Sequence, residues 1–130
     1  MTTPNPKSRH RNGLALVFSE LAHARLHAGL SLACAAGAMG RPVRLFFHGE
    51  SVAALEPHRK WRGDEPLAAA GIPTLADLLV TARELGIPIM ACPSGLHLCH
   101  ITANLLPEGV ETAGMVAFLA AAHDDELLLA

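Results

Sequence analysis

The sequence contains no tyrosine, and its aromatic residues amount to four phenylalanines and one tryptophan among 130 residues. So few aromatic side chains leave little with which to stack nucleic-acid bases. The formal net charge of −2 provides no bulk attraction to a nucleic acid. No apolar run reaches the roughly 20 residues that are needed to cross a bilayer. We therefore expect neither a nucleic-acid partner nor a membrane span.

Motifs for nucleotide binding and for serine hydrolysis are also missing from the sequence. The first apolar run is followed by SELAHARLHAG, which is neither a GxGxxG nor a Walker sequence. No GxSxG nucleophile elbow occurs in the chain. We therefore expect no nucleotide and no other cofactor.

Cysteine is scarce, and its three occurrences are Cys34, Cys92 and Cys99. Residues 1–13 are polar and basic with no apolar core behind them, so they do not resemble a secretory signal. An odd number of cysteines without such a signal argues against a disulfide framework. We expect free thiols in the reducing cytoplasm and a disordered tail over residues 1–12.

The sequence does have an alternation of short apolar runs and helical patterns over residues 13–130, which we interpret as one domain. Hydrophobic residues make up 51% of the chain, enough to build a single core. Predicted strands cover residues 14–19, 43–47, 87–91, 110–113 and 127–129; predicted helices cover 21–38, 74–85, a segment opening at Pro93, and 114–122, with a short helical turn at 51–55. This alternation predicts an α/β fold with a parallel sheet between helices. The polar segment 56–66, with Trp61 inside it, is expected to be an exposed loop.

The junction Cys92-Pro93 is the strongest signal of chemistry. Proline is favoured at the first position of a helix, and the residue before it is held in an extended conformation. Cys92 is therefore predicted to end a buried strand and to cap the helix that follows. Free backbone N–H groups and the helix dipole at that place stabilise a thiolate, which is the reactive form of cysteine.

The ends of the predicted parallel strands bring further polar residues to the same edge of the sheet. Ser19 and Glu20 follow the first strand, and His48 follows the second. Ligands and reactive groups of open α/β sheets gather beyond the carboxyl ends of the strands. A histidine placed there is suited to stabilise the Cys92 thiolate or to transfer its proton.

The other two cysteines are assigned weaker roles. Cys99 lies seven residues after Cys92, which is two turns or roughly 10 Å along an intact helix. A disulfide needs Cα atoms within about 7 Å, so a bridge between these two thiols requires an irregular helix. Cys99 stays a candidate second thiol, and Cys34 is expected to lie in the core.

Histidines at helical spacing suggest a metal site as an alternative. His23 and His27 are four residues apart, and His97 and His100 lie close to Cys92 in the sequence. The spacing matches no standard zinc pattern, and the HExxH motif is absent. We expect scattered surface histidines and no metal.

The segment IMACPSGLHLCHI resembles the signature region of the DsrE/DsrF-like sulfur-relay proteins, in which an apolar strand ends in Ala-Cys and a helix follows. The opening strand, the VRLFF strand, GIPTLADLLVTARELGIPI and VETAGMVAFLAAA occur in the same order, so the resemblance covers residues 13–130. Many relatives continue with Ser-Met-Asp and then Met-Gly. Here those places hold Gly95-Leu96-His97 and Cys99-His100.

The resemblance implies a flavodoxin-like, three-layer α/β/α domain with five parallel strands in the order 4-3-2-1-5. It also implies a small cytoplasmic protein that assembles as a homo-oligomer. The persulfide-carrying position of the family corresponds to Cys92. The residues expected to line the site are Ser19, Glu20, His48, Pro93, Ser94, Gly95 and His97.

We thus expect a sulfur-relay protein that takes up sulfane sulfur on Cys92 and passes it to a partner thiol, a sulfurtransferase-like carrier if it is active. Its partners would be donor and acceptor proteins or small sulfane-sulfur compounds. Two alternatives stay open at this point. One is a non-catalytic, oligomeric binding module of the same fold, and the other is a His/Cys metal-binding protein.

Overall fold

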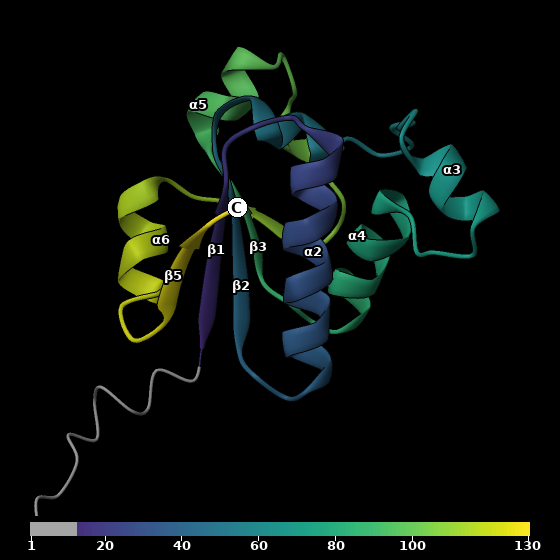
Figure 1. Ribbon diagram of the computed structural model, residues 1–130. Helices are drawn as coiled ribbons and strands as arrows, with labels where there is room; N and C mark the ends of the chain where they lie inside the picture. Colours follow the sequence, from purple (N-terminus) through teal and green to yellow (C-terminus); the bar gives the residue numbers. More distant parts are fainter. Residues whose placement is uncertain (1–12) are drawn as a thin grey trace, which may run out of the picture.

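The computed structural model describes residues 13–130, and the predicted disordered tail, residues 1–12, lies outside the described residues. The strands are β1 (Leu14–Phe18), β2 (Val43–Phe47), β3 (Ile89–Ala91), β4 (Val110–Thr112) and β5 (Glu126–Leu129). The helices are α2 (His23–Ala38), η1 (Gly49–Leu55), α3 (Asp64–Ala69), α4 (Leu75–Glu84), α5 (Pro93–Leu98), η2 (Ala103–Leu105) and α6 (Met115–Ala121). Figure 1 shows how they are arranged.

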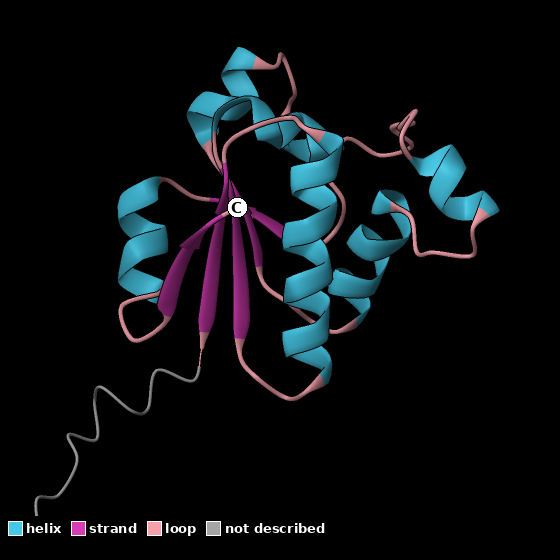
Figure 2. Ribbon diagram, viewed as in Figure 1, coloured by secondary structure: helices cyan, strands magenta, loops and turns pink. Residues whose placement is uncertain are grey.

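The five strands form one parallel sheet in the order β4-β3-β2-β1-β5, which confirms the expected strand order. The inner strands β1 and β2 are almost wholly apolar and buried. Such unbroken apolar runs are typical of parallel strands that are covered on both faces. The fold is therefore the predicted flavodoxin-like α/β arrangement (Figure 2).

Helices cover the two faces of the sheet through the alternating side chains of its strands. On one face α2 packs beside α4, and a Cβ built on Gly29 of α2 would approach the ring of Phe18 to 2.5 Å. On the other face Phe118 of α6 stacks on Phe46 with ring centroids 4.9 Å apart. The helices α2 and α4 thus lie opposite α6 (Figure 1).

The segment expected to be an exposed loop, residues 56–66, differs from the prediction. Its last residues begin the helix α3, and Trp61 is half-buried against the core instead of exposed. Asp64 and Glu65 stand in the first turn of α3, where acidic side chains complement the helix dipole. These two acidic residues are a short signal for the start of a helix, and they lie next to a strongly basic segment that favours interpretation as a loop.

Candidate active site

The carboxyl edge of the sheet brings three of the predicted site residues into line. Phe18 lies opposite Phe47, and Phe47 lies opposite Ala91. The residues that follow, Ser19, His48 and Cys92, therefore leave three adjacent strands at the same level. Backbone hydrogen bonds continue the ladder by one step, from His48 N to Phe18 O (2.8 Å) and from Cys92 N to Phe47 O (3.0 Å).

His48 and Cys92 lie toward the same face of the sheet, because each follows a residue of one registered pair and side chains alternate along strands. The imidazole of His48 stacks over Phe46 with centroids 6.2 Å apart. Its Nδ1 is buried and has no hydrogen-bond partner among the described residues. A buried polar atom without a partner is costly, so this nitrogen is suited to meet a group that binds at the site.

Cys92 caps α5 as predicted from the proline that follows it. Its backbone is extended (φ −68°, ψ 128°), Pro93 opens the helix, and Leu96 N donates to Cys92 O at 3.0 Å. The residue is 5% exposed. Its Sγ lies 2.8 Å from the hydroxyl oxygen of Ser94.

The environment of the thiol favours its ionised form. Burial alone raises the pKa of Cys92. The hydroxyl of Ser94, the backbone N–H of Gly95, the side chain of His48 and the backbone N–H of Ser94 act against burial and together lower the pKa to about 7, below its ordinary value of 9.0. Hydrogen bonds that are directed at an anion stabilise it over the neutral form. A pKa this close to neutrality makes the thiolate accessible at neutral pH.

Gly95 allows α5 to pack directly on the loop that follows β2. A Cβ at this position would lie 2.5 Å from Val52 Cγ2 and 2.6 Å from the carbonyl oxygen of Gly49. Real Cβ atoms do not approach backbone so closely, so the packing requires glycine. The close approach fixes Cys92 relative to His48, the neighbour of Gly49.

Two residues that the sequence analysis missed hold this loop in place. Ser51 is fully buried, and its Oγ lies 2.9 Å from Phe18 O and 2.8 Å from His48 O, so its proton is shared between the ends of β1 and β2. Glu50 Oε1 accepts a hydrogen bond from Leu21 N at 3.2 Å. Ser51 is a single hydroxyl residue before the apolar stretch VAAL, and no sequence pattern indicates that it contacts a residue as distant as Phe18.

The remaining predicted site residues are placed as follows. Ser19 and Glu20 are exposed just beyond β1, and Pro93, Ser94 and His97 are exposed on α5. His97 lies five residues after Cys92, about 140° around a helix. It is therefore directed away from the side that Cys92 occupies.

All three cysteines are free thiols. Cys34 is buried in the core as expected, where burial raises the pKa of its thiol. The Sγ of Cys99 donates to Glu50 O at 3.8 Å. Since α5 is a regular helix from Pro93 to Leu98, Cys92 and Cys99 stand roughly 10 Å apart along its axis, too far for a disulfide without unwinding.

The histidines at helical spacing bind protein groups. His23 Nε2 pairs with Asp64 at 2.6 Å, and His27 Nε2 contacts Pro73 O at 2.8 Å. Residues 13–130 hold no cluster of three or more His, Cys, Asp or Glu side chains placed to bind a metal ion. The metal-binding alternative thus has no support from this part of the chain. Over the same residues, no helix combines the length and apolarity that crossing a membrane requires.

Comparison with known proteins identifies the family of this chain. The model of the DsrE/DsrF-like family matches residues 12–129. The chain belongs to the DsrE/DsrF-like family. This membership suggests a role in sulfur relay. Curated proteins, in contrast, give no match to the sequence.

Two solved structures share the fold of this DsrE/DsrF-like chain. The YchN protein from E. coli superposes with a TM-score of 0.73 at 18% identity, over 91% of this chain and 97% of that one. MTH1491, a protein of unknown function from Methanobacterium thermoautotrophicum, superposes with a TM-score of 0.66 at 15% identity, over 91% and 98%. Likeness at such low identity establishes the fold.

Proposed function

We propose that this protein is a sulfur carrier that holds sulfane sulfur as a persulfide on Cys92. The observation that carries the proposal is the thiol itself, which lies at a strand end with a pKa lowered to about 7 by groups that face it. Thiolate is the nucleophile in sulfur exchange. Membership of the DsrE/DsrF-like family supports the same role.

Uptake is a displacement at sulfur. The Cys92 thiolate attacks the outer sulfur of a donor persulfide R–S–SH, a bond forms between Sγ and that sulfur, and the donor S–S bond breaks. The donor leaves as the thiolate R–S⁻, and Cys92 becomes Cys92–S–SH. With thiosulfate as donor the leaving group is sulfite. No external oxidant or reductant is needed.

Release repeats the displacement on the other side. An acceptor thiolate R′–S⁻ attacks the outer sulfur, the bond to Sγ breaks, and the acceptor leaves as R′–S–SH. The Cys92 thiolate is the leaving group. A thiol of lowered pKa leaves faster in thiol exchange, so the contacts from Ser94 and Gly95 that favour uptake also favour release.

The proposal implies partners and a compartment. The donor and the acceptor are proteins with reactive thiols or small sulfane-sulfur compounds, and no step needs a cofactor. A carrier of this kind acts where thiols stay reduced, as in the cytoplasm. The three free cysteines are compatible with such a compartment.

Intact-mass spectrometry after exposure to polysulfide or thiosulfate tests the proposal. The wild type is expected to gain one or more sulfur atoms, which a reductant removes, and Cys92→Ser is expected to gain none. Cys34→Ser and Cys99→Ser serve as matched controls and should load as the wild type does.

The same experiment separates the alternatives. Equal loading of the wild type and Cys92→Ser would contradict the proposal and place any reactive sulfur elsewhere. No loading of either protein would favour a non-catalytic binding module. Circular dichroism of each variant shows whether a loss of loading reflects a loss of fold.

A further inference from the structure

A cavity separate from the Cys92 site opens between α4 and the chain that follows η1. It encloses about 170 Å³. Its floor includes Ile89 of β3 and Val110 of β4, which lie opposite each other in the sheet. Ile89 precedes Cys92 by three residues, so alternation directs the two side chains toward opposite faces. The cavity therefore lies on the face of the sheet opposite to the Cys92 side chain.

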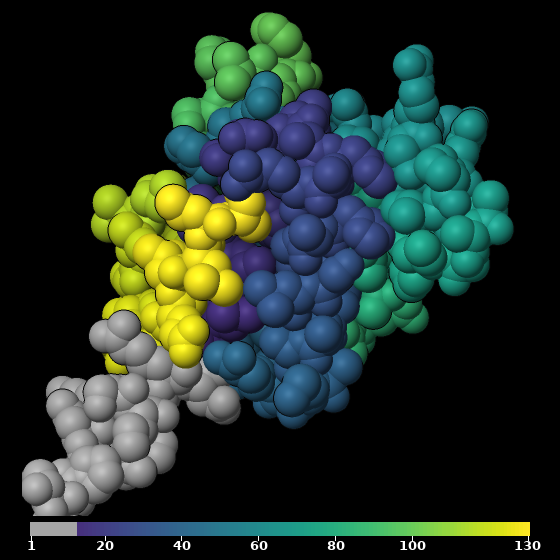
Figure 3. All heavy atoms as spheres, in the orientation of Figure 1, coloured from purple at the N-terminus to yellow at the C-terminus, as the bar shows by residue number. Residues whose placement is uncertain are grey.

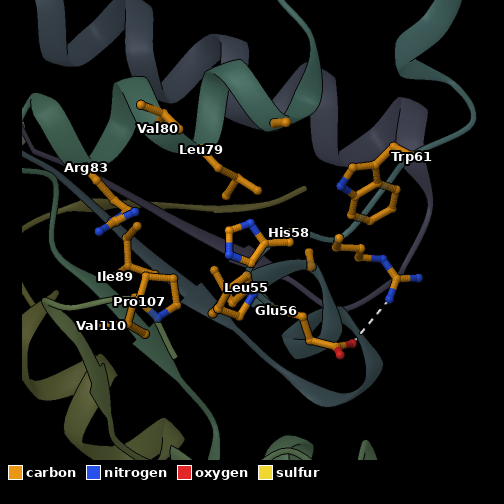
Figure 4. A pocket seen from close by; sticks show the side chains of 14 residues that line it. Leu55, Glu56, His58, Trp61, Leu79, Val80, Arg83, Ile89, Pro107 and Val110 are labelled. Atoms are coloured by element: carbon orange, nitrogen blue, oxygen red, sulfur yellow. Dashed lines mark hydrogen bonds and ion pairs between the residues drawn. The ribbon is translucent and has the colours of Figure 1, made fainter. Parts of the chain in front are cut away.

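The walls of this cavity are mainly apolar. Leu55, Leu79, Val80 and Pro107 complete the surface begun by the two strand residues. Figure 4 shows these side chains facing one another across the opening, with Trp61 at one side. Ligand sites are typically apolar hollows with few polar groups that fix orientation.

The polar groups of the cavity are mainly cationic or cationic when protonated. Arg59, Arg83 and His58 line it, and Glu56 is the acidic residue among them. Glu56 already accepts a hydrogen bond from Arg59 at 3.3 Å. Arg83 forms no ion pair with any described residue, and it reaches toward Ile89 and Pro107 in Figure 4. Arg83, which also borders a neighbouring hollow with Glu108 and Glu111, thus provides a positive charge beside an apolar floor.

Two further features of the rim are typical of binding sites. The Nε of Arg59 is buried without a hydrogen-bond partner among the described residues, while its guanidinium stacks 4.8 Å from the Trp61 ring centre. His58 adopts a left-handed backbone (φ +63°), which is uncommon for a residue other than glycine. Strained backbone and unsatisfied donors are concentrated at binding sites.

We propose that this cavity binds a small organic anion, a carboxylate with a short apolar body. The carboxylate lies by Arg83 and His58, and the apolar body lies on Leu55, Leu79 and Ile89. A cavity must offer about 10–15 Å³ to hold one water molecule. The volume of about 170 Å³ therefore admits a ligand of roughly ten non-hydrogen atoms. Hexanoate is a probe of suitable size and charge.

The sequence supplies its own reporter for the test. Trp61 is the single tryptophan of the chain, the chain has no tyrosine, and Trp61 lines the cavity. Its fluorescence therefore reports on this wall alone. Titration with hexanoate, followed by fluorescence and by isothermal titration calorimetry, is expected to show saturable binding. Hexan-1-ol, which has the same apolar body without charge, is expected to bind at least about 10-fold more weakly.

Arginine variants test the role assigned to Arg83. Arg83→Gln is expected to weaken hexanoate binding by about 10-fold or more, since a hydrogen bond to a charged group contributes about 1.5–3 kcal/mol. Arg83→Lys keeps the charge and should restore most of the affinity. The matched control is Arg62→Gln, an exposed arginine next to Trp61 that lies outside the cavity lining.

These experiments test anion binding in the cavity, and their results do not depend on whether Cys92 carries a persulfide. Cys92→Ser should bind hexanoate like the wild type, because Cys92 does not line the cavity. Absence of saturable heat and of any fluorescence change would overturn the inference. Equal binding of hexanoate and hexan-1-ol, or an equal effect of Arg62→Gln and Arg83→Gln, would do the same.

Discussion

The hydroxyl of Ser94 lies 2.8 Å from the Cys92 sulfur and is the side chain that most directly controls it. A thiolate accepts hydrogen bonds and donates none, so once Cys92 is ionised the hydroxyl must be the donor. The neutral thiol gains less from this contact. The hydroxyl therefore contributes to the low pKa of Cys92 and to its reactivity at neutral pH.

Replacing Ser94 by alanine is expected to raise the pKa of Cys92 by about one unit, since one pKa unit corresponds to about 1.4 kcal/mol and the lost hydrogen bond is of that order. At pH 7 the thiolate fraction would then fall several-fold. The pH dependence of iodoacetamide alkylation, measured with Cys34 and Cys99 replaced by serine, gives the pKa. Ser19→Ala at the same sheet edge is the control, and an unchanged pKa in Ser94→Ala would refute the assignment.

At the scale of elements, the amino end of α4 is tied to two other helices by one carboxylate. Asp64, the first residue of α3, accepts hydrogen bonds from Leu75 N (2.9 Å) and Ala76 N (3.2 Å) and pairs with His23 of α2. Burial raises the pKa of Asp64, but these contacts prevail and lower it below 3.8. The carboxylate thus links α2, α3 and α4.

Asp64→Ala is expected to lower the free energy of unfolding by about 1–2 kcal/mol, because two backbone N–H groups lose a cap and His23 loses its partner. A carboxyl group whose pKa is lowered by folding stabilises the protein at any pH above its pKa in the unfolded chain. That stabilisation is lost as the pH falls through its pKa in the folded protein. The deficit should therefore be present at pH 7 and shrink below about pH 4.

Urea unfolding at both pH values measures this effect. Asp124→Ala removes an exposed carboxylate that contacts His123 at the surface and should cost less than about 0.5 kcal/mol. A deficit of equal size for the two variants, or one that persists at acid pH, would contradict the role given to Asp64.

These contacts also show what sequence reasoning can reach. The cap at Cys92-Pro93 depends on two residues next to each other in the sequence, and the structure has it. Asp64 contacts Leu75 and His23, which are 11 and 41 positions away in the sequence. A local sequence pattern cannot identify partners at such separations.

The candidate site likewise has features that the sequence predicts and features that it does not. Strand ends identified His48 and Cys92 as residues of one edge, because parallel topology alone brings them there. The fixed positions of the two residues depend on Ser51 and on the glycine at position 95, whose contacts are made across the fold. Those contacts follow from three-dimensional packing and not from periodicity.

At the scale of the whole molecule, the sheet has an apolar edge at β5. Leu129 is 82% exposed and Leu127 is 50% exposed. Figure 3 shows this C-terminal segment in yellow at the surface beside α2. An apolar hollow lined by Leu32 lies between β5 and α2. Exposed apolar edge strands are sites of pairing with another chain, so we propose β5 as the contact of the homo-oligomer that the family resemblance implies.

Leu129→Lys is expected to convert the proposed homo-oligomer to a smaller species, ultimately the monomer, because a charge on the edge strand opposes pairing. Sedimentation velocity over a range of protein concentrations measures the effect, and the urea midpoint of the monomer should change little. Leu98→Lys introduces the same charge at an exposed leucine of α5 and should leave the assembly intact. A monomeric wild type, or dissociation by Leu98→Lys instead, would exclude β5 as the contact.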